Sequence, residues 1–235
     1  MAHATQREYI GILAERLPGF FRDCRVLEVG SLDINGSIRD FYKNCDYIGL
    51  DIGAGKGVDV VCEGQKYDAP DNSFDHVISC EVMEHNPHWV PTFKNMIRLC
   101  RPGGLVVMTC AATGRVEHGT TRTTAADSPL TTEAGWDYYR NLTKEDFASQ
   151  IALDADFSSY FLDINWGSYD LCFCGIKRGP AVTADENAAM AAAIQAVRVY
   201  INGTNSAALC RVRKTFAAIV GDRGFEMARS IRSKF

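Results

Sequence analysis

The sequence lacks several features that would set it apart from an ordinary globular protein. No apolar run approaches the roughly 20 residues that a helix needs to cross a bilayer. The first residues, Met-Ala-His-Ala-Thr-Gln-Arg-Glu, lack a basic start followed by an apolar stretch, the pattern of an export signal. The net charge is −4, so nothing favours a general attraction to nucleic acid. We expect a cytoplasmic protein without membrane contact, and the charge disfavours a nucleic-acid partner without excluding one.

The cysteine pattern disfavours a disulfide framework and a cysteine-based metal site. The chain has nine cysteines, an odd number, and no Cys-x-x-Cys pair. We interpret them as reduced thiols, mostly small core residues. Cys172 and Cys174 alternate along an expected strand and therefore share one face. His85 and His88 flank Pro87 without an accompanying ligand set, so we expect no metal site.

What the sequence does contain is an alternation of strand and helix patterns. The 235 residues, 46% hydrophobic and 23% charged, suffice for one well-buried α/β domain with appended elements. Helical spacing covers residues 5–17, 37–42 and 92–100. Apolar, β-branched runs predict strands at 25–29, 47–50, 59–62, 74–79 and 105–109. Strands interleaved with helices indicate a parallel sheet covered on both faces.

The second half of the chain departs from this alternation. Residues 160–164 and 169–176 read as a hairpin around the turn Asn165-Trp166-Gly167-Ser168. Residues 111–141 show little periodicity, and a loop this long is usually functional. We therefore expect one domain over 1–179, with a lid or substrate loop at about 111–141, and a helical extension over 180–235.

The extension contains two further patterns. The Ala-rich helix expected at 185–200, capped by Asp185, offers a contact for a possible homodimer. The last segment, 206–235, carries basic residues that fit either a pair of amphipathic helices with solvated faces or a site for an anionic partner. These residues are Arg211, Arg213, Lys214, Arg223, Arg229, Arg232 and Lys234.

The first segment with chemical meaning is Val26-Leu27-Glu28-Val29-Gly30-Ser31-Leu32-Asp33-Ile34-Asn35-Gly36-Ser37. Gly30 would let a strand turn sharply and lie close to a ligand. Gly36 can adopt positive φ and offer a free amide at the start of the next helix, where a carboxylate would be favoured. A plain strand-to-helix turn explains the same pattern.

Two acids follow at the ends of the next two strands. Asp51 lies about 20 residues after the glycine turn, where nucleotide-binding sheets place a ribose-binding acid. Glu63 directly follows the third strand, where it could accept a hydrogen bond from an adenine amino group. A lone acid at such a position is more often a solvated surface residue, and Glu63 gains its meaning from standing in order with Glu28, Gly30 and Asp51.

The motifs that follow carry a resemblance. Pro70-Asp71-Asn72-Ser73-Phe74-Asp75, Cys80-Glu81-Val82-Met83-Glu84-His85 and Leu99-Cys100-Arg101-Pro102-Gly103-Gly104 resemble successive motifs of the class I methyltransferases (methyltransferase type 11 family), which use S-adenosylmethionine (SAM). The resemblance covers about residues 24–110, and more loosely reaches 177. It implies SAM as cofactor and a Rossmann-like, doubly wound, seven-stranded sheet with helices on both faces and a terminal antiparallel hairpin.

Site residues follow from the resemblance position by position. Glu28, Gly30, Ser31 and Gly36 would border the methionine moiety, Asp51 and Ile52 the ribose, and Glu63 and Gly64 the adenine. Cys80 and Glu81 would lie beside the sulfonium. The family usually has a second glycine where this chain has Leu32, so we expect the methionine-side loop to be reshaped.

The catalytic expectations are modest, because SAM is already an activated methyl donor and positioning is the main task. His118 and His85 are the candidates for a base where the acceptor must lose a proton, although the family's His85 position is often structural. Trp136, Tyr139 and Arg140 are candidates for substrate contact, with packing against the sheet edge as the alternative.

Competing functions remain open at this point. A nicotinamide-dependent oxidoreductase is disfavoured by the absence of Gly-x-Gly-x-x-Gly and Tyr-x-x-x-Lys patterns and by the hairpin. A non-catalytic SAM-binding regulatory subunit is a second alternative. As acceptor we expect a small molecule, a metabolite or saccharide hydroxyl. A tRNA or protein acceptor is the alternative, supported by the basic tail.

Overall fold

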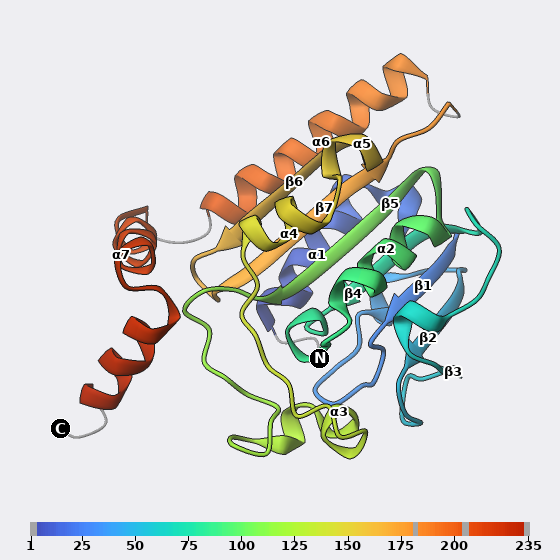
Figure 1. The fold of residues 1–235 in the computed structure, drawn as a ribbon. Helices are drawn as coiled ribbons and strands as arrows, with labels where there is room; N and C mark the ends of the chain where they lie inside the picture. Colours follow the sequence, from blue (N-terminus) through green and yellow to red (C-terminus); the bar gives the residue numbers. More distant parts are fainter. Residues whose placement is uncertain (1–3, 181–182, 204–206, 233–235) are drawn as a thin grey trace.

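The fold is built on one seven-stranded sheet (Figure 1). The computed structural model describes residues 4–180, 183–203 and 207–232. The strand order is β3-β2-β1-β4-β5-β7-β6. The strands are β1 (Arg25–Val29), β2 (Asp46–Asp51), β3 (Val60–Val61), β4 (Phe74–Cys80), β5 (Cys100–Ala111), β6 (Phe157–Asn165) and β7 (Asp170–Lys177). The first five are parallel, and β7 runs antiparallel to both neighbours. The predicted fold class is confirmed, terminal hairpin included.

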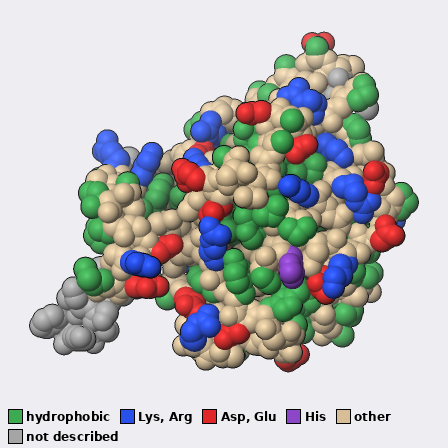
Figure 2. Space-filling view, viewed as in Figure 1, with side chains coloured by type: hydrophobic (Ala, Val, Ile, Leu, Met, Phe, Trp, Pro, Cys, Tyr) green, Lys and Arg blue, Asp and Glu red, His purple; other side chains and the backbone are tan. Residues whose placement is uncertain are grey.

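Helices cover both faces of the sheet, because side chains along a central strand alternate between two apolar clusters. Val26 belongs to the cluster under α1 (Ala4–Arg16) and α6 (Ala184–Gly203). Leu27 belongs to the cluster under α2 (Trp89–Leu99), α4 (Lys144–Gln150) and α5 (Leu153–Asp156). On the face shown in Figure 2, acidic and basic side chains are interspersed around the apolar ones.

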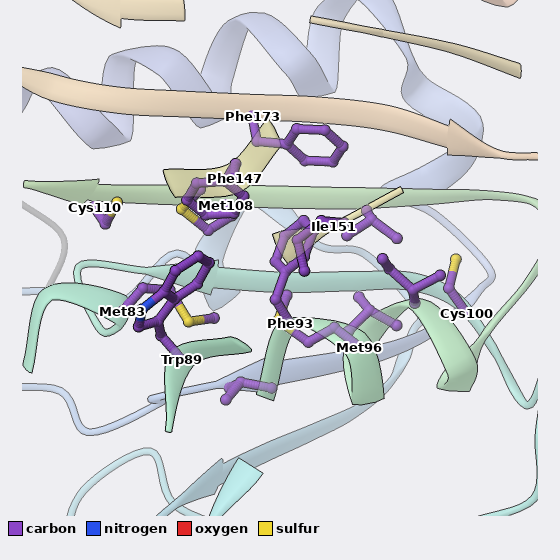
Figure 3. Packing of buried hydrophobic residues seen from close by; sticks show 14 of the residues in the cluster. Met83, Trp89, Phe93, Met96, Cys100, Met108, Cys110, Phe147, Ile151 and Phe173 are labelled. Atoms are coloured by element: carbon purple, nitrogen blue, oxygen red, sulfur yellow. The ribbon is translucent and has the colours of Figure 1, made fainter. Parts of the chain in front are cut away.

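Aromatic side chains fill the layer between the sheet and α2 (Figure 3). Phe93 of α2 meets Phe147 of α4 and Phe173 of β7 edge to face, at centroid distances of 5.2 and 5.3 Å. Trp89 lies 4.8 Å from Phe147. Thr143 begins α4 with a capping box, which satisfies two backbone amides. The chain is therefore fixed directly after the long loop ends.

The helix expected at residues 37–42 is absent, and this prediction was wrong. The segment holds only η2, a three-residue 3-10 helix (Arg39–Phe41). Six residues after a positive-φ glycine are too few for an α-helix to be stable on its own, and the Arg39 guanidinium instead pairs with Asp59 next to β3. The helix N-terminus expected to attract a carboxylate is therefore missing from the first crossover.

The cysteines are free thiols throughout the described residues, six of them buried. Cys172 and Cys174 lie together in the cluster under α1 and α6, as their spacing predicted. Over the same part of the chain, no helix is long and apolar enough to span a bilayer.

The C-terminal extension packs onto the rest of the fold. α6 contributes Ile194, Val197 and Ile201 to the core. The prediction that Asp185 caps this helix was wrong: the Glu186 N–H donates to the Thr183 hydroxyl, one residue before the helix begins. α7 (Ala207–Arg232) is broken at Gly221, whose φ of 56° and ψ of −164° are not helical, so the expected pair of helices is present. Arg213 donates to the Trp166 and Gly167 carbonyls of the hairpin turn at 2.7 and 3.1 Å. That basic side chain therefore serves the fold, and the domain division at 179 stays a prediction.

Candidate active site

A cavity lies where β1, β2 and β4 end and the long loop crosses them. It encloses about 640 Å³ of non-atom space, open solvent at its mouth included. In parallel α/β sheets, ligands bind at this edge, outside the carboxyl ends of the strands. The walls are Val29, Gly30, Leu32, Ile34, Leu50, Asp51, Ile52, Cys62, Gly64, Glu81, Val82, His85, Asn86, residues 127–131 and Trp136. Residues 127–131 and Trp136 come from the predicted lid, and 129–133 of it form the short α3 (Pro129–Glu133).

Gly30 is required by the geometry at the end of β1. Its φ is 84°, which L side chains rarely adopt, and a Cβ would lie 2.0 Å from Val82 Cγ2. The loops after β1 and β4 therefore approach each other closely at the cavity wall. The sharp turn predicted at Gly30 is present, and its approach to a ligand stays a prediction.

Asp51 is held at the end of β2 by two backbone amides. The Leu32 N–H donates to Oδ2 at 3.0 Å, and the Ile52 N–H donates to Oδ1 at 2.8 Å. Burial raises the pKa of this carboxyl, and these two hydrogen bonds oppose the rise. Each carboxylate oxygen keeps a further lone pair. Asp51 is thus a fixed acceptor on the cavity wall, as a ribose-binding acid would need to be.

Leu32 shapes the loop where the family usually has glycine. Its side chain lines the cavity, while its N–H holds Asp51. A Cβ on Gly55 would lie 2.2 Å from Leu32 Cδ1, so Gly55 leaves the room that the leucine fills. An apolar side chain therefore forms the cavity wall at this position, and the reshaping of the loop relative to the family stays a prediction.

Several predicted cofactor residues do not line this cavity. Glu28 is buried and accepts a hydrogen bond from the Tyr47 hydroxyl at 2.7 Å. Burial raises the Glu28 pKa to about 7, and the Tyr47 hydrogen bond opposes the rise. Cys80 lies in the cluster under α1 and α6. Ser31 and Gly36 are also outside the wall, and Gly36 donates its N–H to Asp33 Oδ1 at 2.8 Å.

Glu63 hydrogen-bonds to two neighbouring side chains and does not line the cavity. Its carboxylate accepts from Gln65 Nε2 at 2.6 Å and Lys66 Nζ at 2.5 Å. Its neighbours Cys62 and Gly64 are wall residues. A Cβ on Gly64 would lie 2.8 Å from both Thr92 and Val29. The adenine role of Glu63 stays a prediction, and the backbone around it is what faces the cavity.

A second, more polar cavity adjoins the first. It encloses about 850 Å³, open solvent included, and is lined by Glu81, His85, Arg115, Val116, Glu117, His118, Thr124 and Asp127. Glu81, His85 and Asp127 line both cavities. The guanidinium of Arg115 lies 3.8 Å from Glu81 and 3.3 Å from Asp170. This cavity offers charged and hydrogen-bonding groups directly beside the first one.

The two candidate bases lie together, although 33 positions apart in sequence. The His85 and His118 rings meet edge to face at 5.0 Å, and Tyr139 lies 5.4 and 5.1 Å from them. Burial lowers the His85 pKa to about 3, and the neighbouring His118 lowers it further. Burial also lowers the His118 pKa, against a hydrogen bond of 3.0 Å between its Nδ1 and the Val116 carbonyl. Both rings are therefore neutral at pH 7.

The substrate candidates occupy different places. Trp136 lines the first cavity and lies 5.6 Å from His88. The Tyr139 hydroxyl donates to the Val116 carbonyl at 3.1 Å or to Asn141 Oδ1 at 2.9 Å. Arg140 pairs with Asp146 in the first turn of α4. Tyr139 and Arg140 line a third cavity, together with Arg115 and Asp222.

The sequence reasoning missed part of the site. Arg115 received no role, although it lies three residues before His118. The wall at 127–131 carried one usable signal, the Ser128-Pro129 pair that starts α3. Glu84 is fully buried beside His85, and nothing in its local pattern showed that its carboxylate would meet the lid.

Comparisons with known proteins agree with this geometry. Residues 39–108 match a methyltransferase domain family, and the match begins after Leu32. No curated protein matches the sequence. Among solved structures, Burkholderia thailandensis 1,6-didemethyltoxoflavin-N1-methyltransferase, with bound 1,6-didemethyltoxoflavin and S-adenosylhomocysteine, is 15% identical over 75% of this chain and 79% of its own, with a TM-score of 0.52.

Two further solved structures share the fold. Haemonchus contortus phosphoethanolamine N-methyltransferase 2 is 15% identical over 73% of this chain and 52% of its own, with a TM-score of 0.51. The CurJ carbon methyltransferase is 16% identical over 75% of this chain and 56% of its own, also with a TM-score of 0.51. This chain therefore spans about half the length of both. At these identities the likeness establishes the fold.

Proposed function

We propose a role for each of the two cavities. The premise is that this chain is a class I SAM-dependent methyltransferase, which the family match over residues 39–108 and the strand order of the sheet support. The first cavity would hold SAM, and the second would hold a small acceptor with a hydroxyl group. The observation that carries the proposal is the shared wall: Glu81, His85 and Asp127 line both cavities.

The first cavity fits SAM in the chemistry of its walls. Asp51 is a fixed acceptor for ribose hydroxyls, and Gly30 brings the backbone close to the ligand. Leu32, Ile34 and Leu130 provide apolar surface for the remaining atoms. The bound S-adenosylhomocysteine of the toxoflavin enzyme supports the same ligand here. SAM would supply a methyl group on a positively charged sulfur, and the chain's own residues would position the acceptor.

The second cavity fits a small polar acceptor. Arg115, Glu117 and His118 offer donors and acceptors around a space suited to a metabolite or saccharide. The lid would close over it and exclude water. Because the His118 Nδ1 is engaged with Val116, its neutral ring presents Nε2 as the proton acceptor. His118 is therefore the better candidate base, and His85, with a pKa of about 3, the weaker one.

A macromolecular acceptor has less support. The interspersed charges in Figure 2 offer no broad basic surface on that face, and Arg213 of the basic tail is used within the fold. tRNA or protein methylation stays the alternative. A non-catalytic SAM-binding subunit is the second alternative, which the polar second cavity argues against.

Calorimetry with S-adenosylhomocysteine tests the first half of this proposal. We expect micromolar binding by the wild-type chain and binding weakened about 10- to 100-fold in Asp51→Asn, because a hydrogen bond to a charged group contributes about 1.5–3 kcal/mol. Asp46→Asn, on an exposed part of the same strand, is the matched control. A wild-type chain that binds NAD but not S-adenosylhomocysteine would overturn the proposal.

A screen of hydroxyl-bearing metabolites and saccharides tests the second half. The readout is S-adenosylhomocysteine release together with the mass of the methylated product. Turnover of small hydroxyl compounds supports the acceptor class, whereas turnover of tRNA or protein substrates alone would replace it with the alternative.

We also propose a homodimer and a cytoplasmic location. α6 stays the expected dimer contact, and α7 offers a second one, because its Val212 and Ile219 side chains are exposed about two turns apart. Light scattering of the wild type and of Val212→Asp with Ile219→Asp checks the dimer. The free thiols are consistent with a reducing compartment, and fluorescence imaging of a tagged chain checks the location.

A further inference from the structure

Three side chains beside the second cavity form a set that fits a metal ion, and two of them, His85 and His118, line that cavity. Glu84, His85 and His118 each place one potential ligand atom within 4.8 Å of the others. Glu84 and His85 are buried at 0% and 3% exposure, and His118 is half-buried. Glu84 and His85 come from η4 (Met83–His85), after β4, and His118 comes from the lid. The lid therefore completes a cluster that the β4 loop begins.

The hydrogen bonds of these groups leave lone pairs available. Glu84 Oε1 accepts from the Ala111 N–H at 3.1 Å, whereas Glu84 Oε2 is buried without a partner among the described residues. His85 Nδ1 is likewise buried without one. His118 Nδ1 faces the Val116 carbonyl, which fixes its proton there and leaves the Nε2 lone pair. Metal-binding histidines typically have one ring nitrogen fixed in this way by a backbone carbonyl.

The local charge balance also favours a cation. Glu81, Glu84 and Asp170 are all buried carboxyl groups. Arg115 pairs with Glu81 and Asp170. No ion pair to Glu84 occurs within the described part of the chain. Ionisation of a buried carboxyl group without a counter-ion is unfavourable, and a metal ion would supply the positive charge that an ionised Glu84 needs.

We propose that Glu84, His85 and His118 bind a divalent first-row transition ion, which holds the acceptor oxygen in the second cavity. Two imidazole nitrogens and one carboxylate suit ions such as Zn²⁺ and Mn²⁺, whereas Mg²⁺ prefers oxygen ligands. Three protein ligands leave coordination positions open, and His85 and His118 line the second cavity. The role of the ion rests on the proposed function, but the binding site does not.

The ion would change how the acceptor loses its proton. A hydroxyl oxygen bound to the ion gives up its proton to water more readily: the O–H bond breaks, the electron pair stays on oxygen, and no oxidant or reductant is needed. In that case His118 holds the ion through Nε2 and no longer serves as the base.

Cobalt titration of the chelator-treated full chain tests the site directly. We expect one equivalent of Co²⁺ to bind, with visible absorption typical of nitrogen and oxygen ligands. Glu84→Gln and His118→Ala should each weaken Co²⁺ binding at least tenfold. His88→Ala is the matched control, since His88 lies on the same loop against Trp136 and outside the cluster. Mg²⁺ should not compete with Co²⁺.

Several outcomes would overturn the site. They are no stoichiometric binding, thiolate-to-cobalt charge transfer that places the ion on cysteines, or equal affinity in His118→Ala and the wild type. Titration of the same samples with S-adenosylhomocysteine separates the two proposals. Metal binding without S-adenosylhomocysteine binding would leave the site standing and remove the methyltransferase function, and the reverse result would remove only the metal site.

Discussion

The Asp222 carboxylate of α7 accepts a hydrogen bond from the Asn141 side chain, 2.9 Å away at the end of the lid. The same oxygen accepts the Gly114 N–H at 2.7 Å, near the start of the lid. One residue of the C-terminal extension therefore holds both ends of a segment that lines all three cavities. The extension contributes to the site indirectly, by fixing where the lid leaves and rejoins the sheet.

Asp222→Ala tests this anchoring. We expect a loss of about 1–3 kcal/mol in unfolding free energy, since two donors lose a charged acceptor, and faster amide hydrogen exchange over residues 113–141 than over the β-strands. Urea unfolding and exchange mass spectrometry measure the two effects. Glu15→Ala, exposed near the C-terminal end of α1, is the control. Unchanged exchange in the lid of Asp222→Ala would show that the lid does not depend on α7.

Trp136→Ala and Tyr139→Ala separate the two lid aromatics. Trp136 lines the first cavity, so its removal should weaken S-adenosylhomocysteine binding about tenfold, close to what a buried aromatic contact contributes. Tyr139 packs on His85 and His118. Removal of the Tyr139 side chain should change the affinity for S-adenosylhomocysteine by less than about twofold relative to the wild type. It should raise the KM for the acceptor. Calorimetry and steady-state kinetics give both values. Equal effects of the two substitutions on S-adenosylhomocysteine binding would indicate a shared packing role.

The sheet was predictable because its determinants are local. Apolar, β-branched runs such as Leu105–Thr109 between turns form strands in preference to helices, and the turn residues Asn165–Ser168 mark the hairpin. The crossover at 37–42 was not predictable in this way. Its short helical pattern competes with the pairing of Arg39 to Asp59, a contact that only the folded sheet creates.

The predicted cofactor residues show the same difference between local determinants and contacts that only the folded chain creates. Gly30 and Asp51 end their strands, so the backbone alone directs them to the cavity edge. Glu28 alternates with Leu27 and Val29 and therefore points to the opposite face, which the two-residue period could have indicated. The meeting of Glu84 with His118 depends on the path of the lid, for which the sequence between them carries no periodic signal.

Gly30→Ala should destabilise the fold strongly. The substitution combines a φ of 84° with a Cβ 2.0 Å from Val82, and we expect a loss of about 2–4 kcal/mol in unfolding free energy. Gly19→Ala is the matched control, because a Cβ there meets nothing within 4 Å, and its unfolding free energy should change by less than about 1 kcal/mol. Urea unfolding compares the two. Partial recovery in Gly30→Ala with Val82→Ala would assign the remaining loss to backbone strain.

Glu28→Gln should change how stability depends on pH. Burial raises the Glu28 pKa from 4.5 to about 7. The folded chain therefore keeps this carboxyl protonated at pH values where the unfolded chain has already ionised it. Below pH 4.5 the Glu28 carboxyl is protonated in both states and does not change the unfolding free energy. Between pH 4.5 and about 7 the unfolding free energy falls as the pH rises, and above that range the loss is constant. At about 1.4 kcal/mol per pKa unit, the wild type should lose on the order of 3 kcal/mol across this window relative to Glu28→Gln.

Tyr47→Phe provides the second arm of this experiment. The Tyr47 hydroxyl donates to Glu28 and holds its pKa down, so its removal should move the upper end of the wild-type transition to higher pH. Chemical denaturation of the three proteins from pH 4.5 to 8.5 measures both effects. Parallel curves for the wild type and Glu28→Gln would mean that Glu28 is ionised in the folded chain throughout. Glu28 would then need a counter-charge nearby, and the Arg39 guanidinium, which also lowers its pKa, would be the first candidate.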